Sequence, residues 1–405
     1  MHKFTLCTAT GLSLLLGAAP SFATSGAPNW NLSLVATPTN PQYVSTPDLA
    51  FDHYGTPSVS YSFIDAANTN SVQHAQLTSL GLWSSREVAN GQGTGIRTSI
   101  AFDRSERPTV AWVNQNQTVQ AQFNYGSNLS VGGSASEIRP IVSLAYDLAG
   151  NLRGLYAGTS AGSLSSISFN GSTFSSAALP TLPGVFYTSN AEMTVDHRGL
   201  RQIAARTTLT GGAQALSLLS EPVSGPWSST NLATADAVDG VSIATDPVDG
   251  HIAVAYTTWN SSTNTSKLIY SKFNGSTIAT TEILSFNTFR YQDVSLAFDR
   301  ADDRPAIAFE RRVNSSGAQE LWYAFLNASS AWQTSLIDST VSLDAPDANF
   351  TRAPSLAFDD YNTSWPAVAY VDSNGALNVA FDPPAPEPAS IALFPIIALL
   401  LRRRR

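Results

Sequence analysis

Short apolar runs recur along this chain in pairs, one on each side of an aspartate. Residues 294–309 read VSLAFDRADDRPAIAF: an alternating apolar run ends at Asp299, a polar turn with a proline follows, and a second apolar run begins. No window shows the 3.6-residue apolar period of an amphipathic helix. Because valine and aromatic residues favour strands, the pattern predicts a hairpin of two β-strands joined by a tight turn.

The same phrase returns along the chain at intervals of about 50 residues. In each copy an aspartate ends the first apolar run, and these repeat aspartates are Asp52, Asp103, Asp147, Asp196, Asp246, Asp299 and Asp359. A third strand-like run follows in every copy and a fourth in several, with Gly, Asn, Ser and Asp between them. Four short antiparallel strands per repeat are typical of a propeller blade. The repeat therefore predicts an all-β fold, a seven-bladed β-propeller of four-stranded antiparallel blades spanning residues 28–382.

The two ends of the repeat region complement each other. The last copy stops after its third strand, at residues 378–381, whereas residues 30–35 (WNLSLV) resemble the fourth strand at 332–337 (WQTSLI). Pairing the N-terminal strand with the last blade would close the ring and remove two exposed strand edges. We expect this closure, and no helical domain apart from the terminal targeting segments.

The composition narrows the classes of partner. The formal net charge is −8, and five of the basic residues, Lys3 and Arg402 to Arg405, lie in the terminal segments, so the body is more acidic still. Nucleic-acid binding requires a positive surface, so we expect no nucleic-acid partner. The single cysteine, Cys7, lies near the start of the chain, which excludes a disulfide framework and a cysteine-based metal site in the body.

Residues 1–23 have the pattern of a secretory signal peptide. Lys3 precedes a short apolar run at residues 12–19, and Ser21-Phe22-Ala23 forms a small-residue cleavage site. We expect cleavage after Ala23 and export across the inner membrane. The alternative is a buried N-terminal helix.

Residues 383–405 combine a Pro-Glu-Pro tripeptide, an uncharged apolar stretch at 389–401 and a terminal arginine cluster. This order resembles the PEP-CTERM sorting signal of Gram-negative bacteria. The resemblance implies a transient membrane anchor, recognition by an exosortase-type processing enzyme, and delivery to the outer surface or the extracellular matrix. It also implies processing near Pro386, Glu387 and Pro388.

Two features depart from the PEP-CTERM pattern. The apolar stretch is short for a transmembrane helix crossing ~30 Å at ~1.5 Å per residue, and it contains Pro395. An ordinary tail anchor is the alternative. In both cases we expect membrane contact only through the terminal segments.

The repeat phrase resembles the AxDxxGxPxVAY-type repeat of bacterial propeller proteins, and more distantly sialidase-like propellers. The sialidase Asp-box, S-x-D-x-G-x-T-W, is absent from every copy. The resemblance to sialidase-like propellers therefore does not imply glycosidase activity for this chain.

The repeat aspartates end strands at turns, where a carboxylate accepts hydrogen bonds from the following backbone N–H groups. We expect this role for them rather than metal binding. The loops at residues 246–250 and 300–303 could hold calcium, but neither has the spacing of an EF-hand loop. We expect no cofactor, with calcium as the alternative, and no metal site. His74 alternates with apolar residues in a strand, and we expect it at the surface.

A ligand site is expected at one mouth of the propeller channel, where the loops from fourth to first strand and from second to third strand meet. The candidate ligand-binding residues are Arg97, Arg139, Tyr187, Trp259, Arg290, Tyr291 and Arg352. Aromatic faces beside arginines suit sugars or anionic polysaccharides. The alternative is that these side chains only fill and solvate the channel entrance.

No catalytic constellation is visible in the sequence. We therefore expect a non-catalytic binding or structural module, with extracellular polysaccharide or a surface protein as its partner. A glycoside hydrolase or lyase is the alternative, and it would need two carboxylates ~5–10 Å apart. A purely structural matrix component is a further alternative.

Overall fold

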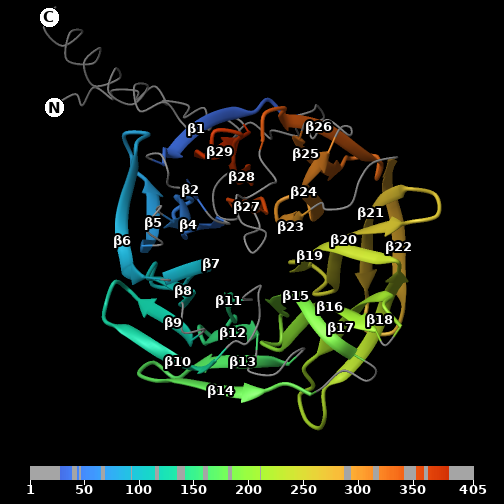
Figure 1. The fold of residues 1–405 in the computed structure, drawn as a ribbon, viewed down its shortest axis with the longest axis horizontal. Helices are drawn as coiled ribbons and strands as arrows, with labels where there is room; N and C mark the ends of the chain where they lie inside the picture. Colours follow the sequence, from blue (N-terminus) through green and yellow to red (C-terminus); the bar gives the residue numbers. More distant parts are fainter. Residues whose placement is uncertain are drawn as a thin grey trace, which may run out of the picture.

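The chain forms a ring of seven antiparallel sheets, which we number as blades 1 to 7 in chain order (Figure 1). The computed structural model describes residues 28–38, 43–44, 47–64, 69–92, 94–114, 118–134, 142–157, 163–180, 185–209, 211–286, 293–312, 319–341, 353–359 and 364–382. No helix occurs in these ranges, so none there is long and apolar enough to cross a membrane. The prediction of an all-β, seven-bladed propeller is confirmed.

In blades 1 to 6 the strands of each blade are consecutive in the chain. Blade 1 contains β3 (Asp48–Phe51), β4 (Pro57–Ile64), β5 (Thr69–Leu77) and β6 (Trp83–Gln92), with the short β2 (Tyr43–Val44) added beside β4. Blade 2 contains β7 (Thr94–Phe102), β8 (Pro108–Asn114), β9 (Thr118–Phe123) and β10 (Asn128–Ser134). Blade 3 contains β11 (Val142–Tyr146), β12 (Leu152–Ala157), β13 (Leu164–Phe169) and β14 (Phe174–Ala178). Blade 4 contains β15 (Val185–Val195), β16 (Arg201–Leu209), β17 (Gln214–Ser220) and β18 (Ser228–Ala235).

The remaining blades follow the same order. Blade 5 contains β19 (Ala237–Thr245), β20 (Ile252–Asn260), β21 (Thr265–Phe273) and β22 (Ile278–Phe286). Blade 6 contains β23 (Val294–Asp299), β24 (Arg304–Arg312), β25 (Gln319–Leu326) and β26 (Trp332–Asp338). Blade 7 contains β27 (Ser355–Phe358), β28 (Pro366–Val371) and β29 (Leu377–Phe381), and its outer strand is β1 (Asn31–Ala36).

The two ends of the propeller therefore meet in blade 7. β1 pairs antiparallel with β29, with Asn31 opposite Phe381, and the two strands lie side by side in Figure 1. The backbone N–H of Asn29 donates to the Asp382 carboxylate at 3.0 Å. Trp30 packs edge-on against Tyr323 of blade 6, with 5.1 Å between ring centroids.

Successive turns of an antiparallel blade lie on opposite faces of the ring. The turns from first to second strand carry the repeat aspartates, and we call their side the aspartate face. The turns from third to fourth strand lie there too. The loops from second to third strand, and from each blade to the next, lie on the other side, which we call the mouth face.

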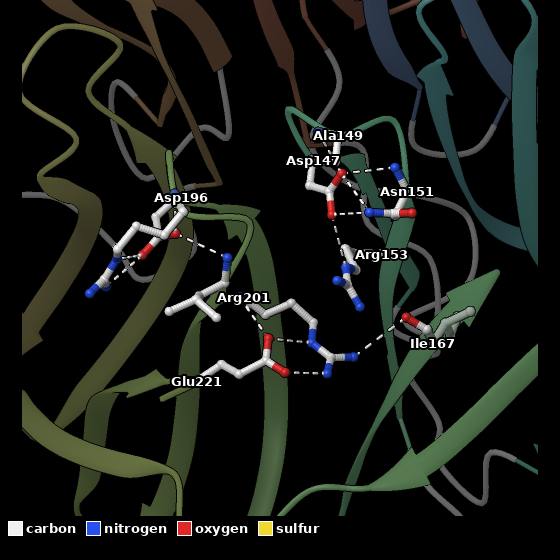
Figure 2. A network of polar contacts seen from close by, with 10 residues as sticks. Asp147, Ala149, Asn151, Arg153, Ile167, Asp196, Arg201 and Glu221 are labelled. Carbon is white, nitrogen blue, oxygen red and sulfur yellow. Dashed lines mark hydrogen bonds and ion pairs between the residues drawn. The ribbon is translucent and has the colours of Figure 1, made fainter. Parts of the chain in front are cut away.

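The repeat aspartates hold the tight turns between first and second strands. Oδ1 of Asp52 accepts hydrogen bonds from the N–H groups of Tyr54 and Thr56 at 2.9 and 2.8 Å. Asp147 makes the same pair of bonds to Ala149 and Asn151, at 2.9 and 2.8 Å (Figure 2). Bonds of the same kind occur at Asp103, Asp196, Asp246 and Asp299, so the predicted role in the turns is confirmed for six of the seven aspartates.

The apolar core is divided among the seams between neighbouring blades. One buried cluster joins Leu49 and Val59 of blade 1 to Val379 of blade 7, and another joins Val113 of blade 2 to Leu144 of blade 3. Each blade thus buries both of its faces against neighbours. The propeller is stabilised by contacts around the ring rather than by one central core.

A ring of hydrogen bonds also links the innermost strands. Four positions before each repeat aspartate stands a residue of what we call the seam ring: Asp48, Ser99, Ser143, Glu192, Ser242, Ser295 and Ser355. Ser99 Oγ accepts from the N–H of Leu144 in the next blade at 3.1 Å. The same contact to the following blade recurs from Ser242 to Leu296, from Ser295 to Leu356, from Ser355 to Leu49 and from Asp48 to Ile100, at 3.0, 2.9, 2.9 and 2.8 Å.

The other two seam-ring residues use different bonds. Ser143 donates to the Met193 carbonyl at 3.4 Å, and Glu192 hydrogen-bonds the Ser242 side chain. Every member of the seam ring therefore reaches the next blade.

The structure corrects the expectation that His74 is exposed. Only 2% of His74 is accessible, and its Nδ1 is hydrogen-bonded to the Tyr125 hydroxyl of blade 2 at 2.7 Å. Burial, with a smaller contribution from Arg86, lowers the pKa of His74 to about 4. Alternation along a strand indicates a solvent face only when one side of the sheet is open, and here neighbouring blades cover both sides.

The seam ring predicts a measurable stability cost when one member is removed. Ser355→Ala leaves the buried N–H of Leu49 without its acceptor, so we expect the free energy of unfolding to fall by about 1–3 kcal/mol. Urea unfolding followed by fluorescence measures the change. Ser84→Ala, at an exposed position of β6, is the matched control and is expected to be neutral. Equal midpoints for the two variants would contradict the role of the ring.

Candidate functional site

The innermost strands enclose a polar cavity of about 250 Å³ in the centre of the ring, which we call the channel cavity. Its walls contain all seven seam-ring residues together with Arg97. Arg97 lies two residues before Ser99 on β7, toward the start of that strand and hence toward the mouth face. The channel is therefore lined by hydroxyl and charged groups rather than filled by an apolar plug.

Arg97 extends from blade 2 to blade 4. Its Nη2 lies 3.4 Å from Glu192 Oε1, and its Nη1 donates to Asn190 Oδ1 at 3.4 Å. The Arg97 and Glu192 side chains are 18% and 27% exposed, so both are accessible from the cavity. This ion pair places a donor and an acceptor where a small molecule in the channel would lie.

The two acids of the seam ring differ in their surroundings. Burial in the channel raises the pKa of Glu192 to about 7, even though Arg97 and Ser242 favour its charged form. Burial also raises the pKa of Asp48, but hydrogen bonds from Ile100, Ser99 and Ser355 oppose that shift. Glu192 can therefore carry or release a proton near neutral pH, while Asp48 has its oxygens engaged in the seam.

A second cavity lies on the mouth face at the seam of blades 4 and 5, and we call it the Trp259 pocket. Its volume is about 780 Å³. It is lined by Ala213, Thr234, Ala235, Asp236, Thr258, Trp259, Asn260, Thr263, Thr265, Lys267 and Ser285.

Local hydrogen bonds hold the polar groups of the Trp259 pocket in place. The Trp259 indole N–H donates to Asn264 Oδ1 at 3.4 Å, which orients the ring. Asp236 accepts from the backbone N–H and the hydroxyl of Ser261, at 2.8 and 2.7 Å, and these bonds lower the pKa of its carboxyl. Lys267 pairs with Glu282 at 2.7 Å. An aromatic face thus stands beside a carboxylate, an amide and several hydroxyls.

The structure places the predicted ligand residues in more than one location. Arg97 lines the channel cavity and Trp259 lines its own pocket, and the two cavities share no lining residue. Tyr187 belongs to β15, where its backbone is opposite Thr208; its side chain is outside the described part. The remaining predicted ligand and processing residues lie outside the described residues: Arg139, Arg290, Tyr291, Arg352, Ala23, Pro386, Glu387 and Pro388.

Asp48, Glu192 and Asp236 were not among the predicted residues. A signal for the first two is present in the sequence. When the copies are aligned on their repeat aspartates, the position four residues earlier is serine except in the copies with Asp48 and Glu192. Asp236 has no comparable signal, because it stands in an irregular loop. Among the described residues, no three His, Cys, Asp or Glu side chains gather as a metal site.

No protein-family model matches this chain, and no curated protein matches its sequence. Solved structures match it in fold. The BP39L lectin from Burkholderia pseudomallei has a TM-score of 0.56 at 10% identity, over 87% of this chain and 99% of the lectin. A protein of unknown function from Dyadobacter fermentans has a TM-score of 0.54 at 10% identity, over 86% of this chain and 98% of that one.

The K499G mutant of NanB sialidase from Streptococcus pneumoniae matches less well. Its TM-score is 0.44 at 13% identity, over 86% of this chain and 70% of the sialidase. Similarity at these identities shows the propeller fold alone.

Glu192 predicts a specific pH dependence of stability. Its folded pKa, about 7, lies above its ordinary value of 4.5, so the stability that it contributes is present below pH 4.5 and is lost as the pH rises through 7. Against Glu192→Gln, the wild type should lose up to about 3 kcal/mol across this interval. His74 acts oppositely, since its depressed pKa costs stability as the pH falls from 6.5 toward 4.

The difference between wild type and Glu192→Gln isolates the contribution of Glu192, because His74 is present in both proteins. Urea unfolding at several pH values between 4.5 and 8 provides the measurement. A pH-independent difference would show that Glu192 titrates normally.

Proposed function

We propose that this protein is an exported, surface-directed propeller that binds carbohydrate in the Trp259 pocket and does not catalyse its turnover. The observation that carries the proposal is the Trp259 indole in a pocket lined by hydroxyls, an amide, a carboxylate and an ammonium group. A surface protein that displays glycans is a partner of the same chemistry.

The size and chemistry of the Trp259 pocket support carbohydrate as its ligand. Pockets for small organic ligands commonly measure ~300–1,000 Å³, and this one measures about 780 Å³. The indole face packs against the C–H face of a sugar ring, while Asp236 and Asn260 accept and donate hydrogen bonds to its hydroxyls. The lectin among the solved structures of this fold supports carbohydrate binding as a use of the scaffold.

The surroundings of Asp48 argue against catalysis in the channel. A retaining glycosidase needs a free carboxylate as nucleophile beside its acid. Asp48 Oδ2 accepts from the Ile100 N–H at 2.8 Å, and Oδ1 accepts from the Ser355 hydroxyl at 3.2 Å. Attack through either oxygen would break a bond that joins two blades.

Glu192 favours a second candidate function, a glycoside hydrolase or lyase acting in the channel. Its pKa of about 7 suits a general acid, and Asp48 and Asp293 are close enough to influence it electrostatically. The channel cavity of about 250 Å³ would admit one small unit of a substrate.

Binding by the Trp259 pocket is tested with purified neutral and acidic polysaccharides immobilised on an array. Trp259→Ala removes the stacking surface, so we expect at least roughly tenfold weaker binding, equivalent to about 1.4 kcal/mol. Tyr54→Ala removes an exposed aromatic side chain on the aspartate face and is the control that should bind normally.

The same polysaccharides separate the two candidate functions. Release of new reducing ends by the wild type but not by Glu192→Gln would replace the binding proposal with the hydrolase. If the wild type neither binds nor cleaves any of them, the protein is a structural matrix component instead.

We also propose that the C-terminal segment directs the protein to the cell surface through an exosortase. Support comes from the order of Pro386-Glu387-Pro388, apolar stretch and arginine cluster after a signal peptide that ends at Ala23. Replacing residues 386–388 by Ala-Ala-Ala should retain the protein in the inner membrane at its full C-terminal length. Cell fractionation with mass spectrometry of the C-terminal peptide makes the measurement. Wild-type protein in the inner membrane with Arg405 intact would instead indicate a tail anchor.

A further inference from the structure

Two cavities of similar construction lie on the aspartate face, away from Arg97 and Trp259. The 2/3 seam pocket, between blades 2 and 3, measures about 280 Å³ and is lined by Asp103, Arg107, Phe123, Tyr146, Gly150, Asn151, Phe169, Asn170 and Gly171. The 4/5 seam pocket, between blades 4 and 5, measures about 490 Å³. Its walls include Asp196, Arg198, Gly250, Phe273, Asn274 and Gly275.

Corresponding residues build one wall of each pocket. In both, the third strand of the later blade ends in the sequence Phe-Asn-Gly-Ser-Thr, at residues 169–173 and 273–277. Asn170 Oδ1 accepts from the N–H groups of Ser172 and Thr173 at 3.0 and 2.9 Å. Asn274 Oδ1 makes the same bonds to residues 276 and 277, at 3.0 and 2.8 Å. The phenylalanine and the glycine therefore occupy equivalent places at the two seams.

An arginine paired with the repeat aspartate stands on the earlier blade of each pocket. Arg107 Nη2 lies 2.6 Å from Asp103 Oδ2, and Arg198 Nη2 lies 2.7 Å from Asp196 Oδ2. The arginine side chains are 47% and 55% exposed while the aspartates are 8% and 2% exposed. Each buried carboxylate thus holds the guanidinium group of a half-exposed arginine, and that of Arg107 also lies over the Phe123 ring at 4.8 Å.

Other seams show how the same place can be closed. In blade 2 the third strand is followed by a different turn, in which Asn124 and Tyr125 both have positive φ angles and the Gly126 N–H donates to the Phe123 carbonyl at 2.9 Å. The Tyr125 hydroxyl bonds His74 of blade 1, and Arg86 lies over the Tyr125 ring at 4.2 Å. Between blades 3 and 4, Arg201 pairs with Glu221 at 2.6 Å and donates to the Ile167 carbonyl of blade 3 at 3.5 Å (Figure 2).

The two seam pockets are open because their glycines leave the space unfilled. Gly171 and Gly275 have φ angles of +96° and +91°, and a Cβ atom at either position would meet nothing within 4 Å. At the seam of blades 1 and 2 the turn after β9 is of another kind, and its Tyr125 side chain contacts His74 across the seam. An open or a filled seam thus corresponds to a different turn after the third strand.

The geometry points to the two seam pockets as binding sites for neutral sugar residues of a polysaccharide. Each pocket offers an aromatic ring for the C–H face of a sugar, together with a guanidinium donor and amide groups for its hydroxyls. Because the repeat aspartate already neutralises each arginine, the pair presents no net positive charge. A neutral sugar therefore suits these sites better than a uronate.

These sites lie opposite the Trp259 pocket and share none of its lining residues. One molecule could then hold carbohydrate on both faces and cross-link two chains of an extracellular matrix. That cross-linking consequence rests on the proposed function, whereas the seam pockets themselves do not.

The experiment measures monosaccharide stoichiometry by NMR titration of the mature protein carrying Trp259→Ala, which removes the mouth-face site. The probes are D-glucose, D-galactose, D-mannose and L-fucose, with D-glucuronate for comparison. We expect at least one neutral sugar to bind at two sites, with shifts at Asn170 and Asn274, and more tightly than the uronate. Gly171→Tyr with Gly275→Tyr, in the same background, should abolish both sites.

Gly81→Tyr is the matched control, since Gly81 also has a positive φ, +74°, and open space around its Cβ position, but lies in blade 1. It should retain two sites. Arg107→Gln with Arg198→Gln removes the guanidinium groups, each of which also pairs with a buried aspartate, and should weaken binding about tenfold even if the tyrosine variants fold poorly.

The inference is overturned if none of the four neutral sugars binds the Trp259→Ala protein, or if this protein prefers glucuronate. It is also overturned if binding survives in the paired tyrosine and glutamine variants. If Trp259→Ala loses polysaccharide binding but still binds monosaccharides at the seams, both proposals hold. If Trp259→Ala keeps polysaccharide binding, the function proposed for the mouth face fails. If no monosaccharide binds at the seams, this inference alone fails.

Discussion

The hydrogen bond from each innermost strand to the next blade is the contact on which the rest of this propeller depends. A blade has little apolar surface that it can bury alone, so the seven sheets are stable only when their seams close. The seam ring supplies a buried polar contact at each closure, and a hydroxyl such as that of Ser295 satisfies a backbone N–H that would otherwise be buried without an acceptor.

The same ring explains why the channel is polar. Its side chains turn sideways to the next blade instead of packing against each other across the axis, so a cavity lined by hydroxyls remains. Where Glu192 replaces serine, the seam contact persists, but a carboxyl group is now buried beside Arg97 and its pKa rises to about 7. This position of the seam ring thus carries a titratable carboxyl group and still bonds the next blade.

The candidate binding sites, by contrast, lie where the seams are incomplete. On the mouth face, Asp236 between β18 and β19 and Trp259 near the end of β20 line the same pocket. On the aspartate face, the two pockets lie beside Gly171 and Gly275, whereas Tyr125 contacts His74 across the seam of blades 1 and 2. The same scaffold repeats in all seven blades of the chain, and the cavities form where individual blades differ from one another.

The sequence by itself determined the blade number, the strand order and the role of the repeat aspartates, because these depend on local alternation and on turn chemistry that repeats within the chain. It also indicated Arg97 and Trp259 as candidate ligand residues, but it placed them in loops, whereas the structure has them in β7 and β20. Only the tertiary structure decided that these two line separate cavities, that His74 is buried, and that burial raises the pKa of Glu192 to about 7. Those properties depend on side chains from different blades that meet at a seam or across the channel, far apart in the chain, and no local pattern records which groups will meet there.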